Sequence, residues 1–302
     1  MGLPMSIVYR PARDNELETA EALVVRSING LTERHGFGKM ASPRPAHFQS
    51  FSLRDDPDGL WIAEDNGAIL GFAFSWVSGD LWFLAELFVA PGHQGSGIGN
   101  ELLARTLAHA EQNKATHKAL ITFAFNTVSQ GLYIRHGLYP QIPLYFVKAA
   151  RETLLSRLKP PRLHSTRLSI TDLGQLTAID AHAQGVSREK HHRYLLADSA
   201  MTGVLLHHGD ACVGYAYINP DGHIGPLAVT RSDMVGAAFQ SALALAVERG
   251  AAQATALIPG ASDAALDVAS GHGLRITFPM LLMSSRAFGD WRCYLPRNPG
   301  FM

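Results

Sequence analysis

Runs of apolar residues separated by turn residues fill the first third of the chain. The run Gly59–Glu64 is followed by Asp65-Asn66-Gly67, and the run Ala68–Val77 comes directly after that turn. Asn-Gly between two strand-like runs favours a tight hairpin. A second turn at Ser78-Gly79-Asp80 leads into Leu81–Val89. The pattern therefore predicts three strands in an antiparallel meander.

Helical spacing of apolar residues appears on both sides of this meander. Before it, we expect a short strand Ile7–Arg10, a helix that begins after an Asp14 N-cap, and a loop over residues 31–45, where Gly and Pro are frequent. After it, a glycine-rich turn at residues 91–99 opens a helix whose apolar positions recur at three and four. A strand Ala119–Phe125, a helix Val128–Arg135 and a strand near Leu144–Val147 are expected to follow.

The second half of the chain repeats this order of elements. Val89 and Gly137 are 48 residues apart, and Val229 and Gly273, the matching positions, are 44 apart. His136-Gly137-Leu138 also recurs as His272-Gly273-Leu274. Near-equal spacing favours duplication. We therefore expect an α+β fold of two domains, over 1–150 and 163–302, with residues 151–162, which include Lys-Pro-Pro, as the linker.

Composition narrows the class of protein. The 302 residues are 47% hydrophobic, and 26 Lys and Arg balance 26 Asp and Glu. No net basic field attracts nucleic acid or anionic lipid. The apolar runs are shorter than a membrane span, and Met1–Arg10 has no signal-peptide pattern. We expect a cytoplasmic protein without nucleic-acid or membrane partners.

Cysteine and histidine give no sign of a metal site. Cys212 and Cys293 are too few and too far apart for a zinc site or a disulfide framework. The 14 histidines include the pairs His191-His192 and His207-His208. Adjacent side chains on one helix or strand point apart, so neither pair chelates a metal alone. The expectation is no metal.

The glycine-rich turn is the strongest candidate binding feature. Gly95, Gly97 and Gly99 precede a helix start, where unpaired N–H groups and the helix dipole favour an anion such as phosphate. Tight turning and helix packing alone would also explain these glycines. The dinucleotide fingerprint fails because position 100 is Asn100 and five residues separate Val89 from Gly95. The P-loop fails because no Gly-Lys-Ser/Thr ending is present.

Gln94-x-x-Gly97-x-Gly99 resembles the acyl-coenzyme A motif of the GNAT N-acyltransferase superfamily, Arg/Gln-x-x-Gly-x-Gly/Ala. A second signature of that family, Asn, then Tyr seven residues later, then Gly-Phe, is similar to Asn126, Tyr133 and Gly137-Leu138. Ser129 stands where Ala is usual and Leu138 where Phe is usual. The resemblance covers about residues 5–150, with a degenerate second repeat behind it.

The resemblance implies the fold and the cofactor site. Each domain would be a mixed, mostly antiparallel sheet flanked by helices, with its fourth and fifth strands splayed. Main-chain groups of the fourth strand would pair with the pantetheine arm of acetyl-CoA, and N–H groups of the turn would hold its pyrophosphate. The expected cofactor-binding residues are Leu87, Phe88, Val89, Gln94, Gly95, Ser96, Gly97, Ile98, Gly99, Asn100, Asn126 and Tyr133.

Two side chains are candidates for proton transfer. The family motif places the Tyr133 hydroxyl beside the cofactor sulfur, where it would protonate the departing thiolate. Glu86 interrupts an apolar strand, which is costly unless the carboxylate has a task or a partner, so it is the candidate base. A water relay in its place stays open. His35 or Phe37 would border the acceptor, by analogy with the fold.

The second repeat lacks these features. Alignment of Val229 on Val89 places Met234, Ala237, Phe239 and Ala269 at the positions of Gln94, Gly97, Gly99 and Tyr133. Side chains at the turn obstruct the close approach of a phosphate. We expect this domain to be retained for architecture or for a homodimer contact, and the aromatic, proline-rich tail from Phe288 to dock on a domain surface.

The sequence therefore predicts an acetyl-CoA-dependent N-acetyltransferase acting on a primary amine of a small molecule or protein, by direct attack on the thioester. Tandem members of the superfamily include mycothiol-type synthases, so the amine of a thiol precursor is one candidate acceptor. The alternative is a non-catalytic acyl-CoA sensor or interaction module, which would have no need of an acid at Tyr133. A dinucleotide oxidoreductase is disfavoured by Asn100.

Overall fold

The computed structural model describes residues 7–302. The first six residues of the predicted first domain, which also begin the stretch Met1–Arg10 without a signal-peptide pattern, lie outside the described residues. Two compact units are present. The first unit consists of the residues up to Ile121 together with Phe125–Tyr139, and the second unit of Thr122–Ala124 together with Pro140–Met302. The chain therefore divides at residue 139, not at the expected residue 150.

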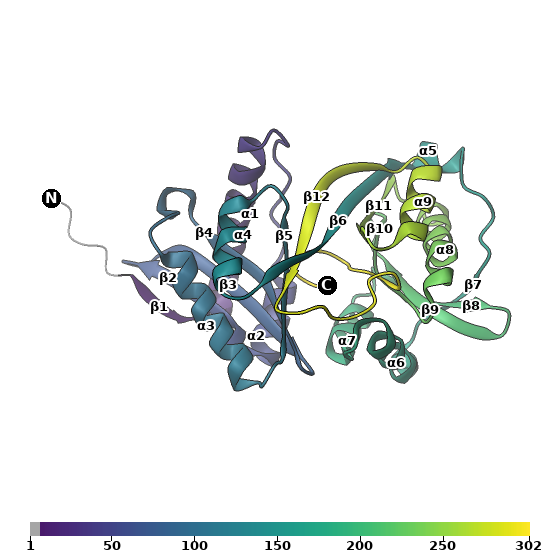
Figure 1. Cartoon of the computed structure of the whole chain (residues 1–302). Helices are drawn as coiled ribbons and strands as arrows, with labels where there is room; N and C mark the ends of the chain where they lie inside the picture. The colour runs from purple at the N-terminus through teal and green to yellow at the C-terminus, as the bar shows by residue number, and fades with distance from the viewer. Residues whose placement is uncertain (1–6) are drawn as a thin grey trace. The chain divides into compact units, whose positions relative to one another are not determined.

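The first unit is a sheet flanked by helices (Figure 1). Its strands follow the order β1-β2-β3-β4-β5, antiparallel except for the parallel pair β4–β5. Its elements are β1 (Val8–Pro11), η1 (Asp14–Glu16), α1 (Leu17–Arg34), α2 (His47–Asp55), η2 (Pro57–Gly59), β2 (Leu60–Asp65), β3 (Ala68–Ser78), β4 (Leu81–Val89), η3 (Pro91–His93), α3 (Ile98–Gln112), β5 (His117–Phe123) and α4 (Thr127–Arg135).

Helix α3 is anchored on the sheet by its first two turns. Ile98 and Leu102 pack with Ala63 of β2 and with Ala73 of β3 in one buried cluster. A Cβ at Gly71 would lie 2.8 Å from a Leu102 methyl carbon, so only glycine permits this close approach of helix and strand. The packing fixes where the glycine-rich turn meets the sheet.

The meander agrees with the sequence prediction almost residue for residue, whereas α1 does not. It continues through Arg34 into the segment expected to be a loop. Leu23, Val24 and Thr32 are buried along it, so tertiary packing extends the helix to Arg34, beyond Gly30.

The second unit repeats the mixed sheet. Its strands follow the order β12-β6-β11-β10-β9-β8-β7, and β13 pairs with β10. Its elements are β6 (Tyr139–Ala150), α5 (Arg151–Leu155), β7 (His164–Arg167), η4 (Ile170–Asp172), α6 (Leu173–Gln184), α7 (Glu189–Ala197), β8 (Thr202–His208), β9 (Ala211–Ile218), β10 (His223–Val229), η5 (Ser232–Met234), α8 (Val235–Glu248), β11 (Gln253–Pro259), α9 (Asp263–Gly271), β12 (Arg275–Ser284) and β13 (Tyr294–Leu295).

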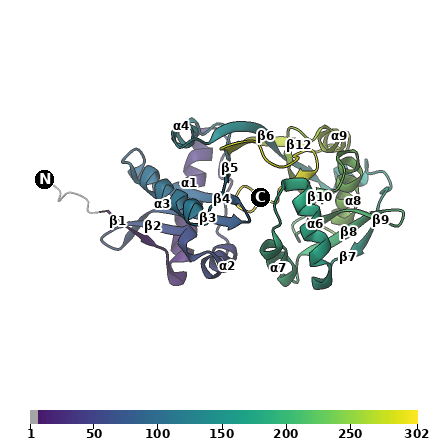
Figure 2. The same cartoon turned by 60° about the horizontal axis from the view of Figure 1, so that its bottom comes forward.

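Strand β6 explains the shifted division of the chain. It was expected to close the first domain, but it pairs antiparallel with β11, from Leu144↔Pro259 to Ala150↔Gln253. Strand β12 lies on its other edge, and both views show the two long strands side by side (Figures 1 and 2). The last two residues of β5, Thr122 and Phe123, also belong to this unit, as does Ala124, whose N–H donates to Pro279 O at 3.3 Å.

The expected linker is partly helical. α5 lies at its start, and Leu154 of that helix is fully buried. The Arg151 side chain donates from Nε and Nη2 to Val247 O, both at 3.2 Å. The first half of the segment therefore belongs to the second unit.

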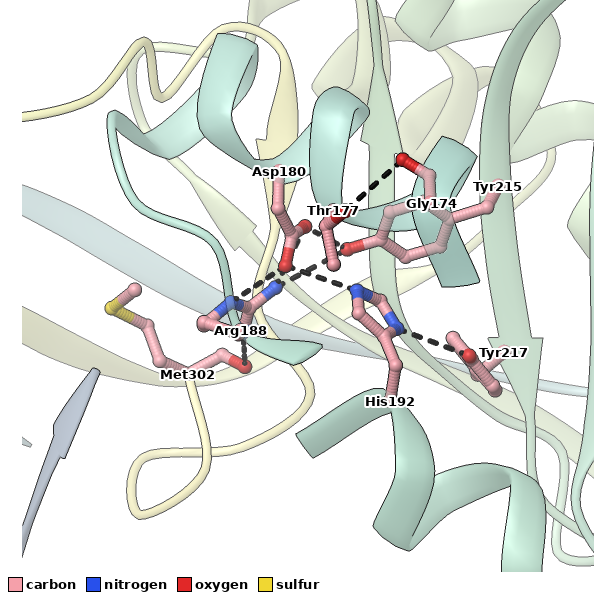
Figure 3. Close-up of polar contacts among 8 residues, drawn as sticks. All are labelled: Gly174, Thr177, Asp180, Arg188, His192, Tyr215, Tyr217 and Met302. Carbon is pink, nitrogen blue, oxygen red and sulfur yellow. Dashed lines mark hydrogen bonds and ion pairs between the residues drawn. The ribbon is translucent and has the colours of Figure 1, made fainter. Parts of the chain in front are cut away.

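A buried polar network lies between α6, α7 and β9 (Figure 3). Asp180 accepts hydrogen bonds from Arg188 Nε at 3.0 Å and Nη2 at 3.1 Å, and His192 Nε2 lies 3.0 Å from its Oδ2. Tyr215 also donates to Asp180, and His192 Nδ1 contacts Tyr217 Oη at 3.1 Å. Burial alone would raise the pKa of Asp180, but the Arg188 guanidinium and His192 hold that pKa well below its usual range.

Among residues 7–302, no helix is both long and apolar enough to cross a membrane.

Candidate active site

The glycine-rich turn leads directly into the start of α3, and residues 95–100 are called the cradle below. Gly95 and Gly97 have φ values of +83° and +90°, and Gly97 is the N-cap of the helix. A Cβ at either position would meet nothing within 4 Å, so the space beside this backbone is open. The first bond into the helix is Glu101 N–H to Gly97 O. The amides of Ile98, Gly99 and Asn100 lie in the first turn of α3, where the helix offers them no acceptor, so they can receive a phosphate.

Side chains of the turn brace it. Gln94 Nε2 donates to Val89 O at 3.2 Å, and Ser96 Oγ donates to His93 O at 2.6 Å. Asn100 Oδ1 lies 2.9 Å from His136 Nε2, which ties α3 to the end of α4. The Gln94 side chain therefore ties the loop to the end of β4, and the Ser96 side chain braces the loop on itself.

The end of β4 beside the turn has no strand partner toward β5. The parallel pairing runs from Leu81↔His117 to Leu84↔Leu120 and stops there. On the other edge, Ser75 faces Leu84 and Phe74 faces Glu86, so Ala85 is an extra, bulged residue. The expected splay of the fourth and fifth strands therefore begins at this bulge.

Along this end of β4, the main-chain N–H and C=O groups of successive residues point alternately toward β3 and toward the free edge. Ala90 N–H donates to Leu70 O in β3 at 2.8 Å, so the main-chain groups of Phe88, two residues earlier, also face β3. Those of Leu87 and Val89 face the free edge. Val89 O already accepts from Gln94 and from Ser27 Oγ, the latter at 3.3 Å. Of the three residues expected to pair with pantetheine, Leu87 and the Val89 N–H are therefore the ones placed to do so.

Tyr133 lies on α4 and is 5% exposed. Burial raises the pKa of its hydroxyl, and a hydrogen bond with Ser129 opposes that rise. Asn126 is the N-cap of α4: its Oδ1 accepts from Ser129 N–H at 3.3 Å, and its Nδ2 donates to Ser129 Oγ at 2.7 Å. Ser129, the departure from the family pattern, thus links the cap to the tyrosine.

Glu86 lies on β4 just after the bulge. Its Oε1 accepts from Gln49 Nε2 of α2 at 3.1 Å, and the same nitrogen donates to Glu21 Oε2 of α1 at 3.1 Å. Glu86 Oε2 is buried and has no hydrogen-bond partner among the described residues. Burial, followed by the nearby charge of Glu21, raises the pKa of Glu86 to about 8, although the bond from Gln49 acts against this.

Three aromatic side chains pack together at the loop after α1. Phe37 stacks on Phe125 with ring centroids 4.7 Å apart, and His35 contacts the same ring at 4.9 Å. Phe37 is 38% exposed. Since Phe125 directly precedes Asn126, the two residues expected near the acceptor lie beside the start of α4.

The second unit differs at each matching position. α8 begins at Val235, so Ala237 lies inside the helix, and the Phe239 ring is fully buried. Ala269 is also buried. Its methyl side chain offers no hydroxyl in place of Tyr133. Pro226, three residues before Val229, stands where Glu86 stands three residues before Val89. None of these residues matches the open glycine turn, the tyrosine or the glutamate of the first unit.

The C-terminal tail, through β13, pairs with β10 where β10 and β11 are no longer paired. β10 pairs with β11 only at His223 and Ile224, and β13 then takes over the same edge of β10, with Leu295 opposite Leu227. Val229 N–H donates to Cys293 O at 2.9 Å. The tail therefore pairs with the β10 residues that match Leu87–Val89 in β4.

Sequence reasoning missed Gln49, Glu21 and the role of Ser129. Gln49 is 28 residues from Glu21 and 37 from Glu86, and no local pattern links the three. The only available signal was Ser129, noted as an exception to the motif. In the described chain, no group of three or more His, Cys, Asp or Glu is placed to hold a metal ion.

Comparisons with known proteins agree with this geometry. The profile of the Acetyltransferase (GNAT) family matches residues 27–138. The chain is 33% identical over 96 residues to the uncharacterized N-acetyltransferase YhfO of Bacillus subtilis strain 168, a match over 30% of this chain and 64% of that protein.

Solved structures extend the likeness to the whole chain. A putative acetyltransferase from Pyrococcus horikoshii has a TM-score of 0.75 at 16% identity, covering 100% of this chain and 98% of that one. A tandem GNAT protein from the clavulanic acid biosynthesis pathway has a TM-score of 0.60 at 15% identity, covering 94% and 98%. These likenesses confirm the predicted fold class of two GNAT-like domains. Residues 27–138 are therefore similar to the Acetyltransferase (GNAT) family, and the fold of the chain is that of solved proteins with two GNAT-like domains.

Proposed function

We propose that the chain is an acetyl-CoA-dependent N-acetyltransferase whose first unit transfers an acetyl group to a primary amine. The observation that carries the proposal is the open glycine turn and the first-turn amides of α3, at residues 98–100, next to the unpaired end of β4. An anion site and an open strand edge at this spacing suit a ligand with a pyrophosphate at one end and an amide-containing arm at the other.

Acetyl-CoA supplies the acetyl group as a thioester. The amides from Gly95 to Asn100 hold its pyrophosphate, and Leu87 and Val89 N–H pair with the pantetheine arm. The Asn126 side chain lies next to the arm. A main-chain N–H of β4 polarises the thioester carbonyl as negative charge develops on its oxygen.

Glu86 and Tyr133 handle the protons. Ionised Glu86 takes a proton from the acceptor ammonium, which leaves a neutral amine to attack the carbonyl carbon. The N–C bond forms as the C–S bond breaks. Tyr133, kept protonated by burial, donates its proton to the leaving sulfur. The nitrogen loses its second proton to water, and water restores the proton of Tyr133.

The second unit supports the architecture and performs no transfer in this proposal. Ala237, Phe239 and Pro226 replace the cradle and the base, and β13 fills the strand edge. The acceptor amine belongs to a small molecule or a protein, and the site of action is the cytoplasm.

Release of free thiol from acetyl-CoA in the presence of an amine panel tests the proposal. Amine-dependent release is expected. If release is absent with every amine while acetyl-CoA raises the melting temperature, the sensor alternative replaces the enzyme.

Two variants test the cofactor-binding turn and the proposed acid separately. Gly97→Trp places a ring over the cradle and should abolish acetyl-CoA binding, whereas Gly209→Trp, another open glycine with positive φ (+61°), should leave it intact. Tyr133→Phe should lower turnover by about a hundredfold or more with cofactor binding nearly unchanged, while Tyr139→Phe, at an exposed tyrosine, should be neutral. Binding by Gly97→Trp at wild-type affinity would contradict the assigned cradle.

A further inference from the structure

Glu86 of β4, Gln49 of α2 and Glu21 of α1 form one polar cluster in which Gln49 bridges the two carboxyls. Gln49 of α2 donates from one nitrogen to Glu86 Oε1 and to Glu21 Oε2, each at 3.1 Å. The two carboxylate oxygens therefore lie within about 6 Å of each other. Gln49 is 8% exposed, so this bridge is formed away from bulk water.

One oxygen of this cluster has no partner. Glu86 Oε2 is buried and accepts no hydrogen bond within the described residues. An ionised carboxylate in such a position is costly unless a donor or a cation meets it. When Glu86 is ionised, a partner for this oxygen would donate a hydrogen bond to it, and a positive charge on that partner would offset the repulsion between Glu21 and Glu86.

The surrounding charges leave the cluster negative. Arg44 is the cation that acts on Glu21, and Glu18 on the same helix adds a further negative charge. Burial, more than these charges, raises the pKa of Glu21. Phe48 of α2 and Phe74 of β3, opposite Glu86 in register, pack edge to face at 5.4 Å. Aromatic rings therefore lie beside Glu86, and Arg44 is the cation that opposes the raised pKa of Glu21.

We propose that Gln49 and Glu21 are positioning residues that hold Glu86 toward the acceptor, and that the three side chains form a site for an acceptor amine that enters as an ammonium cation. The inference rests on the proposed function and extends it from Glu86 to the two side chains that position it. The ammonium donates a hydrogen bond to Glu86 Oε2, one N–H bond breaks, and an O–H bond forms on that oxygen. The products of this step are the neutral amine and the neutral carboxylic acid, while Gln49 keeps its bond to Oε1.

The test follows the ionisation of Glu86 directly, by ¹³C NMR of labelled glutamate carboxyls in the full-length protein, with Glu86→Gln assigning the signal. Glu21→Gln removes a like charge within about 6 Å, so the Glu86 midpoint should fall by about one pH unit. Glu33→Gln, the same change at an exposed position of α1, should not move it. Gln49→Leu removes the donor and should raise the midpoint.

A second measurement probes the cation site. Ethylammonium chloride should lower the Glu86 midpoint relative to sodium chloride at equal ionic strength, because a cation at Oε2 favours the carboxylate. In thiol release, Glu21→Gln should shift the acid limb of the pH profile to lower pH and raise the KM for amine more than it changes kcat.

The outcomes separate the two proposals. An unchanged Glu86 midpoint in Glu21→Gln, or equal effects of the two salts, would overturn the cation site even in an active transferase. Thiol release absent in the wild type with every amine, alongside the expected midpoint shifts, would overturn the transfer activity and the acceptor role. In that case only the electrostatic coupling of Glu21, Gln49 and Glu86 would remain supported.

Discussion

At the scale of single residues, the surroundings of Glu86 and of the β4 main chain are set by contacts between residues far apart in sequence. Glu86 is conspicuous as a carboxylate in an apolar strand, and Tyr133 falls in a spaced motif. Whether Glu86 is solvated or buried depends on Gln49, whose contact with it crosses 37 positions of sequence. The direction of the main chain at Phe88 depends on the bond between Ala90 and Leu70. Such long-range contacts leave no local pattern.

The raised pKa of Glu86 predicts a pH-dependent stability. A free glutamate titrates near 4.3 and Glu86 at about 8, so between these values the folded chain binds more protons than the unfolded chain. Its stability contribution is therefore greatest at low pH and is lost as pH rises through the folded value. Glu86→Gln removes this dependence.

Urea unfolding of both proteins across this interval tests the prediction. The variant should gain stability relative to the wild type as pH increases, and Glu33→Gln should not. A constant difference between variant and wild type across the interval would contradict the assigned burial of the carboxyl.

At the scale of elements, local pattern predicted strands well and their partners less well. Turn residues bound β2, β3 and β4 closely, and the glycine turn marks the start of α3. Nothing in the run Leu144–Val147 indicates that β6 pairs with β11, because strand pairing is decided by tertiary contacts. The tail was expected to dock on a surface, and instead β13 completes the edge of β10. A two-residue strand carries no periodicity.

The docking of β13 should contribute strongly to the stability of the second unit. Leu295 is fully buried, so Leu295→Ala should lower the free energy of unfolding by about 2–5 kcal/mol. Leu155→Ala, at a leucine that is 55% exposed, should cost about 0.5 kcal/mol or less. Denaturant unfolding measures both. Equal costs would show that the tail is not packed as described here.

At the scale of the whole molecule, two units of one fold class have diverged in the polarity of their interiors. The first unit keeps a buried carboxylate, Glu86, with an unpaired oxygen. In the second unit, Asp180 has its oxygens paired with Arg188, His192 and Tyr215. An unpaired buried acid suits a site that awaits a ligand, whereas a paired one suits a structural core.

The variant Asp180→Asn tests whether Asp180 serves the structural core rather than a ligand site. The variant keeps the shape of the side chain but leaves the buried Arg188 guanidinium without a counterion, which should cost roughly 3–5 kcal/mol near neutral pH. Because the pKa of Asp180 is lowered on folding, its contribution is present above the unfolded value of about 3.9 and is lost as pH falls through the folded value. The deficit of the variant should therefore shrink in strong acid. Asp210→Asn, at an exposed aspartate, is the matched control.

Urea unfolding at neutral and acidic pH, together with acetyl-CoA titration of the folded variant, completes the test. The affinity for acetyl-CoA should match that of the wild type, because the cradle belongs to the first unit and Asp180 to the second. A stable Asp180→Asn protein that has lost acetyl-CoA binding would reverse the assignment, since it would place the ligand in the second unit. An unstable protein that still binds supports a division of labour in which one repeat keeps the chemistry and the other keeps a filled, fully paired core.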